Sequence, residues 1–133
     1  MLIEQALMTF LLAQTGITGY VGRRIYFNQA KQATAKPYLV IKKISGPREH
    51  SHDGSCGLAH PRFQFSCFAK EYGDAKNAIA AIQTALDGYS GTMGGDSGVT
   101  VGAAFYDDEN DFYEEDTGLH HVAADYIIWH KES

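Results

Sequence analysis

Side chains that could bind a metal or act as nucleophiles gather between residues 46 and 60. They are, in chain order, His50, His52, Asp53, Cys56 and His60. Imidazole, thiolate and carboxylate groups are ligands of zinc and related divalent metals. Structural zinc sites usually draw paired ligands from two turns, whereas one segment carries all five here, in a spacing that matches no zinc signature. We therefore expect a polar loop or hairpin tip. The alternative is a small metal-binding or hydrolytic domain built on this segment.

The two cysteines give weak support for nucleophilic catalysis. Such a cysteine needs a partner histidine and an orienting acid. Cys67 shares one face of an expected strand with Phe63 and Phe65, so we expect a small core residue. Cys56 has histidine and aspartate neighbours only in its own segment, whereas catalytic partners usually come from distant parts of a fold. We predict no catalytic residue, no cofactor and no enzyme activity, and two cysteines make no disulfide framework.

Acidic residues crowd a second segment, residues 107–116. They are Asp107, Asp108, Glu109, Asp111, Glu114, Glu115 and Asp116. A calcium loop needs a glycine at its central turn, which this run lacks. Crowded carboxylates repel one another, so a positive group is expected nearby. Phe112 and Tyr113 lie inside the run as apolar anchors, which favours an interface between protein chains over a solvated tail.

Charge is distributed unevenly along the 133 residues, whose formal net charge is −5. Residues 1–70 hold nine of the eleven Lys/Arg residues and only three of the sixteen acids. Unlike charge on two parts of one chain favours copies that meet unlike surface to unlike surface. We therefore predict that the acidic run of one copy faces Arg23, Arg24 or Arg48 of the next. The acidic total disfavours a protein that coats nucleic acid.

Hydrophobic periodicity predicts the elements that carry these residues. A helical stripe begins at Ile3 and is expected to stop at Gly16 and Gly19, and a second helix is expected from about Glu71 to Leu86. Alternation and β-branched content predict strands. The expected strands are 21–26, 38–45, 60–69, 99–105 and 119–130. Residues 107–117 are expected to form an acidic loop. The glycine-rich segment 91–98 lacks the Gly-Lys-Ser/Thr ending of a phosphate loop and is expected to be a connector.

This order of elements differs from the regular βαβα alternation of a parallel doubly wound domain. It predicts an α+β fold, with two helices packed on one face of a mainly antiparallel sheet. The length and the lack of a linker predict a single domain, residues 1–133. No apolar stretch of 18 or more residues is present, so no membrane helix is expected. Glu4 interrupts the first apolar stretch, which is therefore not expected to be a secretory signal.

Several short pieces resemble, in order, the small tail-completion or tail-terminator proteins of long-tailed bacteriophages and prophages. After the first helix the pieces are 22–26 (GRRIY), 37–40 (PYLV), 44–46 (ISG), the polar segment, 63–67 (FQFSC), 86–91 (LDGYSG) and 126–130 (YIIWH). No single piece is diagnostic, whereas the ordered set covers nearly the whole chain. The chain is thus similar to this family of minor tail proteins.

The resemblance implies a structural protein of the virion tail, assembled in the host cytoplasm. It implies a homo-oligomeric ring, commonly of six copies, that caps the tail tube, ends tube polymerisation and presents a docking surface for the head. The implied partners are further copies of the chain, the major tail tube protein and the head–tail connector protein. No membrane and no sequence-specific nucleic acid are implied. The alternative from another class is an adaptor that forms no ring and binds a peptide along a sheet edge.

Overall fold

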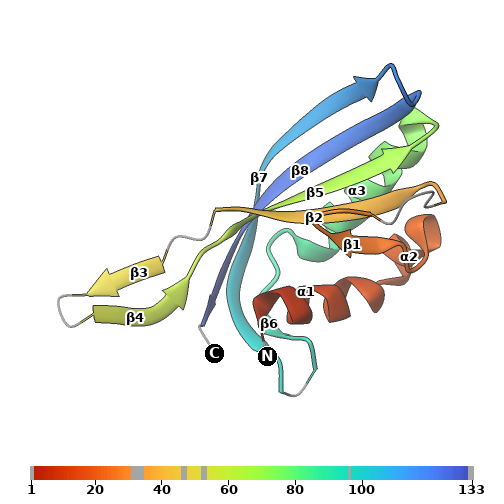
Figure 1. Ribbon diagram of the computed structural model, residues 1–133. Coiled ribbons are helices and arrows are strands. Elements are labelled where there is room, and N and C mark those ends of the chain that lie inside the picture. Colours follow the sequence, from red (N-terminus) through yellow and green to blue (C-terminus); the bar gives the residue numbers. More distant parts are fainter. Residues whose placement is uncertain (1, 31–34, 46–47, 52–53, 96, 132–133) are drawn as a thin grey trace.

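The computed structural model describes residues 2–30, 35–45, 48–51, 54–95 and 97–131. These residues form three helices and eight strands (Figure 1). The helices are α1 (Ile3–Leu12), α2 (Thr15–Val21) and α3 (Tyr72–Leu86). The strands are β1 (Ile25–Phe27), β2 (Tyr38–Ser45), β3 (Arg48–Ser51), β4 (Gly54–Ala59), β5 (Arg62–Ala69), β6 (Gly91–Met93), β7 (Val99–Glu114) and β8 (Leu119–Lys131).

The eight strands pair into one mixed sheet. β1 runs parallel to β2, and the other pairings among the described strands are antiparallel. β8 pairs with β5 on one side and with β7 on the other, so the body of the sheet runs β1–β2–β5–β8–β7. The predicted α+β class is confirmed, and the parallel β1 makes the sheet mixed.

The core forms where the apolar sides of strands and helices meet. Phe63, Phe65 and Cys67 on β5 are fully buried, as their alternation predicts. Burial of each large apolar side chain contributes about 1.5–3 kcal/mol to folding. α3 contacts β5 and β8, α2 contacts α3, and α1 contacts α2. Side chains of all three helices therefore share one buried cluster with the sheet, which spans the chain from Ile3 to Ile128.

The predicted end of the first helix is wrong. α1 stops at Leu12, and a further helix, α2, contains both Gly16 and Gly19. Each glycine costs a helix about 1 kcal/mol, but Ile17 and Val21 lie four residues apart and are fully buried. That burial outweighs the low helix propensity. The chain instead turns at Gly22, whose φ of +60° suits glycine.

The segment 107–117 is not the predicted loop. β7 continues through residues 107–114 and pairs with β8 as far as Glu114 and Leu119. Strand propensity disfavours consecutive acids, but pairing along the long β8 overrides it. The segment 46–60 contains the β3–β4 hairpin, one of the two predicted forms, which extends from the end of the sheet (Figure 1). The glycine-rich connector contains the short strand β6.

None of the helices in the described ranges is both long enough and apolar enough to cross a membrane.

Candidate self-assembly surface

Residues 108–114 form the outer end of β7, which we call the acidic edge. Between Tyr106 and Asp108 the pairing of β7 with β8 shifts by one residue, so Asp107 is the extra residue of a β-bulge. Beyond the bulge, Glu109 lies opposite the fully buried Ala124, on the helix side of the sheet. Asp108 lies opposite Asp125, on the other side. The bulge therefore distributes the carboxylates over both faces.

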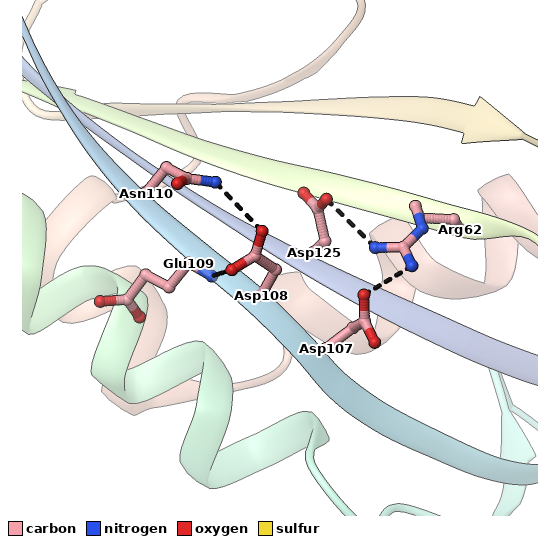
Figure 2. Close-up of polar contacts among 6 residues, drawn as sticks. All are labelled: Arg62, Asp107, Asp108, Glu109, Asn110 and Asp125. Carbon is pink, nitrogen blue, oxygen red and sulfur yellow. Dashed lines mark hydrogen bonds and ion pairs between the residues drawn. The ribbon is translucent and has the colours of Figure 1, made fainter.

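On the face away from the helices, Arg62 binds two carboxylates (Figure 2). Its guanidinium nitrogens lie 2.5 Å from Oδ2 of Asp107 and 3.2 Å from Oδ2 of Asp125. The hydrogen bond to Asp107 is the main cause that raises the pKa of Arg62. Asp107 and Asp125 therefore receive their counter-charge from the same chain, through a cation on β5.

On the helix side, α3 supplies a second cation. Lys76 Nζ pairs with Glu109 and lies 3.0 Å from Asp111 Oδ1. Tyr72 Oη donates a 2.7 Å hydrogen bond to the other oxygen of Asp111. The bonds to Glu109 and then Asp111 raise the pKa of Lys76, while the bonds from Tyr72 and Lys76 lower that of Asp111. We call Tyr72 and Lys76 with these two acids the α3 latch, because they hold the acidic edge against the helix.

The remaining acids of the run have no cation among the described residues. Asp108 accepts hydrogen bonds from the Glu109 backbone N–H at 2.9 Å and from Asn110 Nδ2 at 3.3 Å (Figure 2). Glu114, Glu115 and Asp116 are exposed at the tip of the β7–β8 hairpin. The prediction of a nearby positive group is thus met within the chain for part of the run. Four carboxylates stay available to another molecule.

Two of the three predicted basic partners, Arg23 and Arg24, lie at the opposite side of the sheet from the acidic edge. Arg23 and Arg24 directly precede β1, which pairs only with β2 in the described structure. Arg23 is exposed, whereas Arg24 Nε donates a 3.0 Å hydrogen bond to the carbonyl of Pro37. Arg48 begins β3, away from β1 in the strand order, and its side chain lies outside the described part. Arg23 is therefore more accessible than Arg24.

Two groups of aromatic rings that no sequence pattern predicts lie around β8, in contact with β5, β7 and α3. On the face away from the helices, His121 on β8 lies between Phe68, with 4.2 Å between centroids, and Phe112, at 5.3 Å. On the helix side, His120 contacts Tyr72 and Tyr113. Only the register between distant strands brings these rings together, so no local signal could have revealed the groups.

The candidate metal ligands do not form a site in the described structure. His52 and Asp53 lie outside the described residues, and His50 and Cys56 are described only by their backbone, in β3 and β4. The ring of His60 stacks on Trp129 at 4.1 Å. Within the described ranges, no three His, Cys, Asp or Glu side chains form a group that could hold a metal ion.

Cys67 is fully buried, and burial raises the pKa of its thiol to about 12. The thiolate, which is the nucleophilic form, is therefore scarce at neutral pH. The location of Cys67 agrees with the predicted core role.

Comparison with known proteins identifies the family. Residues 5–131 match the family model of tail completion protein gp17. A solved chain from the virion of a native gene transfer agent particle is similar, with a TM-score of 0.76 and 16% identity. That match covers 95% of this chain and 91% of the other, and it shows a shared fold. No curated protein matches. The family match spans nearly the whole chain, and the protein therefore belongs to the tail completion protein gp17 family.

Proposed function

We propose that this protein acts as a single structural domain that caps a phage tail tube as a ring. Membership of the tail completion family supports a structural role in the tail. The ring ends polymerisation of the tube and offers its other face to the head. Six copies are expected, and the protein has no enzymatic role in this scheme.

The observation that carries the ring is the opposite charge at the two sides of the sheet, acidic along β7 and basic in the segments beside β1. The acidic edge and the hairpin tip beyond it lie on one side, while Arg23, Arg24 and Lys36 flank β1 on the other. A head-to-tail contact joins two different patches of one chain, and it closes into a ring when the rotation per copy divides a full turn. Unlike patches also oppose the symmetric pairing, in which like charge would meet like charge.

The interface that we propose joins the unpaired acids of one copy to the basic residues of the next. Asp108, Glu114, Glu115 and Asp116 carry it on the acidic side, and Arg23 carries it on the basic side. Asp107, Glu109 and Asp111 form ion pairs within the chain, with Arg62 and Lys76. We therefore assign their side chains to holding β7 in place and not to the charged contact between copies. Arg24 and Arg48 stay secondary candidates.

The proposed partners beyond the ring are the major tail tube protein and the head–tail connector protein. The complex would be part of the virion tail after assembly in the host cytoplasm. This chain would meet the tube with one face of the ring and the connector with the opposite face. Such stacking makes the closed ring, rather than the single chain, the functional unit.

A null allele in the phage or prophage tests this function directly. Negative-stain images of the lysate should show tails of uncontrolled length or tails without heads. A plasmid copy of the wild-type gene should restore normal particles, which serves as the control for effects on neighbouring genes. Normal virions from the null allele would refute the proposal.

A further inference from the structure

The β-bulge at Asp107 changes which main-chain groups of β7 face outward. Before the bulge, the Tyr106 N–H donates to Asp87 Oδ1 at 3.0 Å, and the Ala104 carbonyl accepts from the Gly88 N–H at 2.8 Å. Both groups therefore point away from β8, toward the segment that follows α3. That segment covers the edge of β7 up to Tyr106.

Beyond the bulge, the main-chain N–H and C=O groups of β7 again alternate in direction, but the alternation is shifted by one residue. The Glu114 carbonyl accepts from the Gly118 N–H at 2.8 Å, across the turn to β8, so the main-chain groups of Glu114 point inward. In a strand, N–H and C=O of one residue share a side, and the side alternates along the chain. The main-chain groups of Asp108, Asn110 and Phe112 therefore point toward β8. The main-chain groups of Glu109, Asp111 and Tyr113 point outward, and no strand of the described structure pairs with them there. The Glu109 N–H already donates to Asp108 Oδ1, so the Glu109 carbonyl and both main-chain groups of Asp111 and Tyr113 remain for an added strand.

The α3 latch holds this open edge in place. Two of the three residues with outward main-chain groups, Glu109 and Asp111, have their side chains fixed by Lys76, and Tyr72 holds Asp111 as well. The Glu109 carbonyl and the N–H and C=O groups of Asp111 are thus presented by a strand that its own helix holds. A fixed edge loses less conformational entropy when a second strand pairs with it. An exposed row of such groups is a template for an added strand.

The charge on this edge limits what can pair with it. Two acidic edges would bring carboxylates of like sign together, so pairing between identical edges is disfavoured. The opposite edge of the sheet, β1, is open and flanked by Arg23 and Lys36, both exposed. Ile25 and Phe27 turn main-chain groups outward there, because Arg24 and Asn28 bond to β2.

We propose that the outer edge of β7 at Glu109, Asp111 and Tyr113 accepts the β1 edge of the next copy, so that the sheet continues from copy to copy. This inference rests on the proposed ring and gives its interface a main-chain component beside the charges. The occupant is a second copy of this chain, selected by its basic residues.

Proline at position 111 removes one outward N–H and tests the pairing. Asp111→Ala is the matched control, because it loses the same carboxylate but keeps the N–H. Sedimentation velocity at low salt and high protein concentration should show oligomers for wild type and Asp111→Ala, and at least tenfold weaker association for Asp111→Pro. Equal association of the two variants would overturn the inference and leave the proposed ring intact. A wild-type chain that never associates would count against the ring itself.

Asn110→Pro tests the direction of the groups. Proline is tolerated on an edge where its nitrogen faces solvent, but not where it removes a hydrogen bond of the sheet. The melting temperature of Asp111→Pro should be close to that of Asp111→Ala, whereas the melting temperature of Asn110→Pro should be clearly lower. The reverse order of melting temperatures would refute the assignment. Hydrogen exchange of the wild type gives an answer even if a variant fails to fold. The amides of Asp111 and Tyr113 should be protected only in the oligomer, whereas the Glu109 amide already donates to Asp108 within the chain. Unchanged exchange of Asp111 and Tyr113 would contradict the pairing.

Discussion

At the scale of single residues, the acids of residues 107–116 divide into those that pair with a cation of the same chain in the described structure and those that do not. Their spacing in the sequence does not predict which acid belongs to which group. Asp107, Glu109 and Asp111 bind cations of their own chain, whereas Asp108 and the hairpin tip bind none among the described residues. The sequence predicted that a positive group lies near the run. It could not identify Arg62 and Lys76, because both are distant in the chain and only the folded register brings them close. For Lys76, the sequence showed only that it lies off the apolar face of α3, and this does not predict a pairing with Glu109 or Asp111.

His121 offers a test at this scale. Its Nε2 is buried without a hydrogen-bond partner in the described structure, and burial lowers its pKa, while Glu114 opposes the shift. The pKa of a histidine in the unfolded chain is near 6.5, and in the folded chain the pKa of this one is lower. As far as His121 is concerned, the fold therefore keeps its full stability above pH 6.5, and it loses stability as the pH falls from 6.5 through the folded pKa. We expect His121→Phe to stabilise the fold by about 1 kcal/mol and to flatten the loss of stability between pH 7.5 and 5.5.

Urea unfolding at these two pH values measures the effect. Tyr126→Phe is the matched control, because it removes the other buried polar atom without a partner, and burial raises its pKa far above this range. Its effect should be the same at both pH values. A His121→Phe variant with the pH dependence of the wild type would show that His121 does not titrate with unfolding.

At the scale of elements, the sequence predicted what depends on local pattern and missed what depends on distant partners. The strand 38–45 and the helix that ends at Leu86 agree with the structure, because burial follows their period directly. α2 was missed because its glycines suggested a stop, although the buried pair Ile17 and Val21 could have indicated a helix. The second half of β7 was missed because its support comes from β8 and α3.

The α3 latch gives the prediction for this scale. Lys76→Met removes the cation and leaves the carboxylates of Glu109 and Asp111 facing each other. Partly exposed ion pairs are worth about 0–1 kcal/mol each, so we expect a loss of about 1 kcal/mol in the free energy of unfolding at pH 7. The pKa of Asp111 is lowered in the fold, so its ion pair should keep its contribution to the free energy of unfolding as the pH falls toward 3.8. That contribution should be lost as the pH falls further, through the folded pKa.

Urea unfolding at pH 7 and pH 3 measures the latch, with Lys70→Met as the control for an exposed lysine outside it. The difference between the two variants should be present at pH 7 and small at pH 3. If Lys76→Met and Lys70→Met unfold alike at pH 7, the latch does not stabilise the strand.

At the scale of the whole molecule, the fold turns an asymmetry of the sequence into an asymmetry of space. The basic half of the chain supplies β1 and β2, and the acidic half supplies β7 and β8, which lie on opposite sides of the sheet. Arg62 crosses this division and pairs with acids of the other half. The sequence could predict the polarity, but not that it runs from edge to edge, because the strand order is not a local property.

A charge swap tests this polarity. Reversal of the hairpin tip by Glu115→Lys with Asp116→Lys should weaken association about tenfold, since two or three exposed pairs contribute about 1.4 kcal/mol together. Arg23→Glu alone should weaken it as well, and the chain with all three changes should recover. Sedimentation velocity at low salt compares the four proteins. Asp107 and Glu109 are kept, because their reversal would break pairs within the chain.

If the triple variant associates no better than either partial one, then Glu115 and Asp116 do not face Arg23. The charged interface would then lie on other residues.

The short β1 edge has a consequence for how the proposed ring would assemble. The Ile25 N–H already donates to the Arg23 carbonyl, and the Phe27 carbonyl already accepts from the Gln29 N–H. Only the Ile25 carbonyl and the Phe27 N–H are left for a neighbour. In the proposed ring, a single contact between copies would therefore be brief, and a misplaced copy could dissociate before further copies hold it in place. Closure of that ring would add the last contact without a further loss of translational freedom, so complete rings would persist while incomplete ones dissociate.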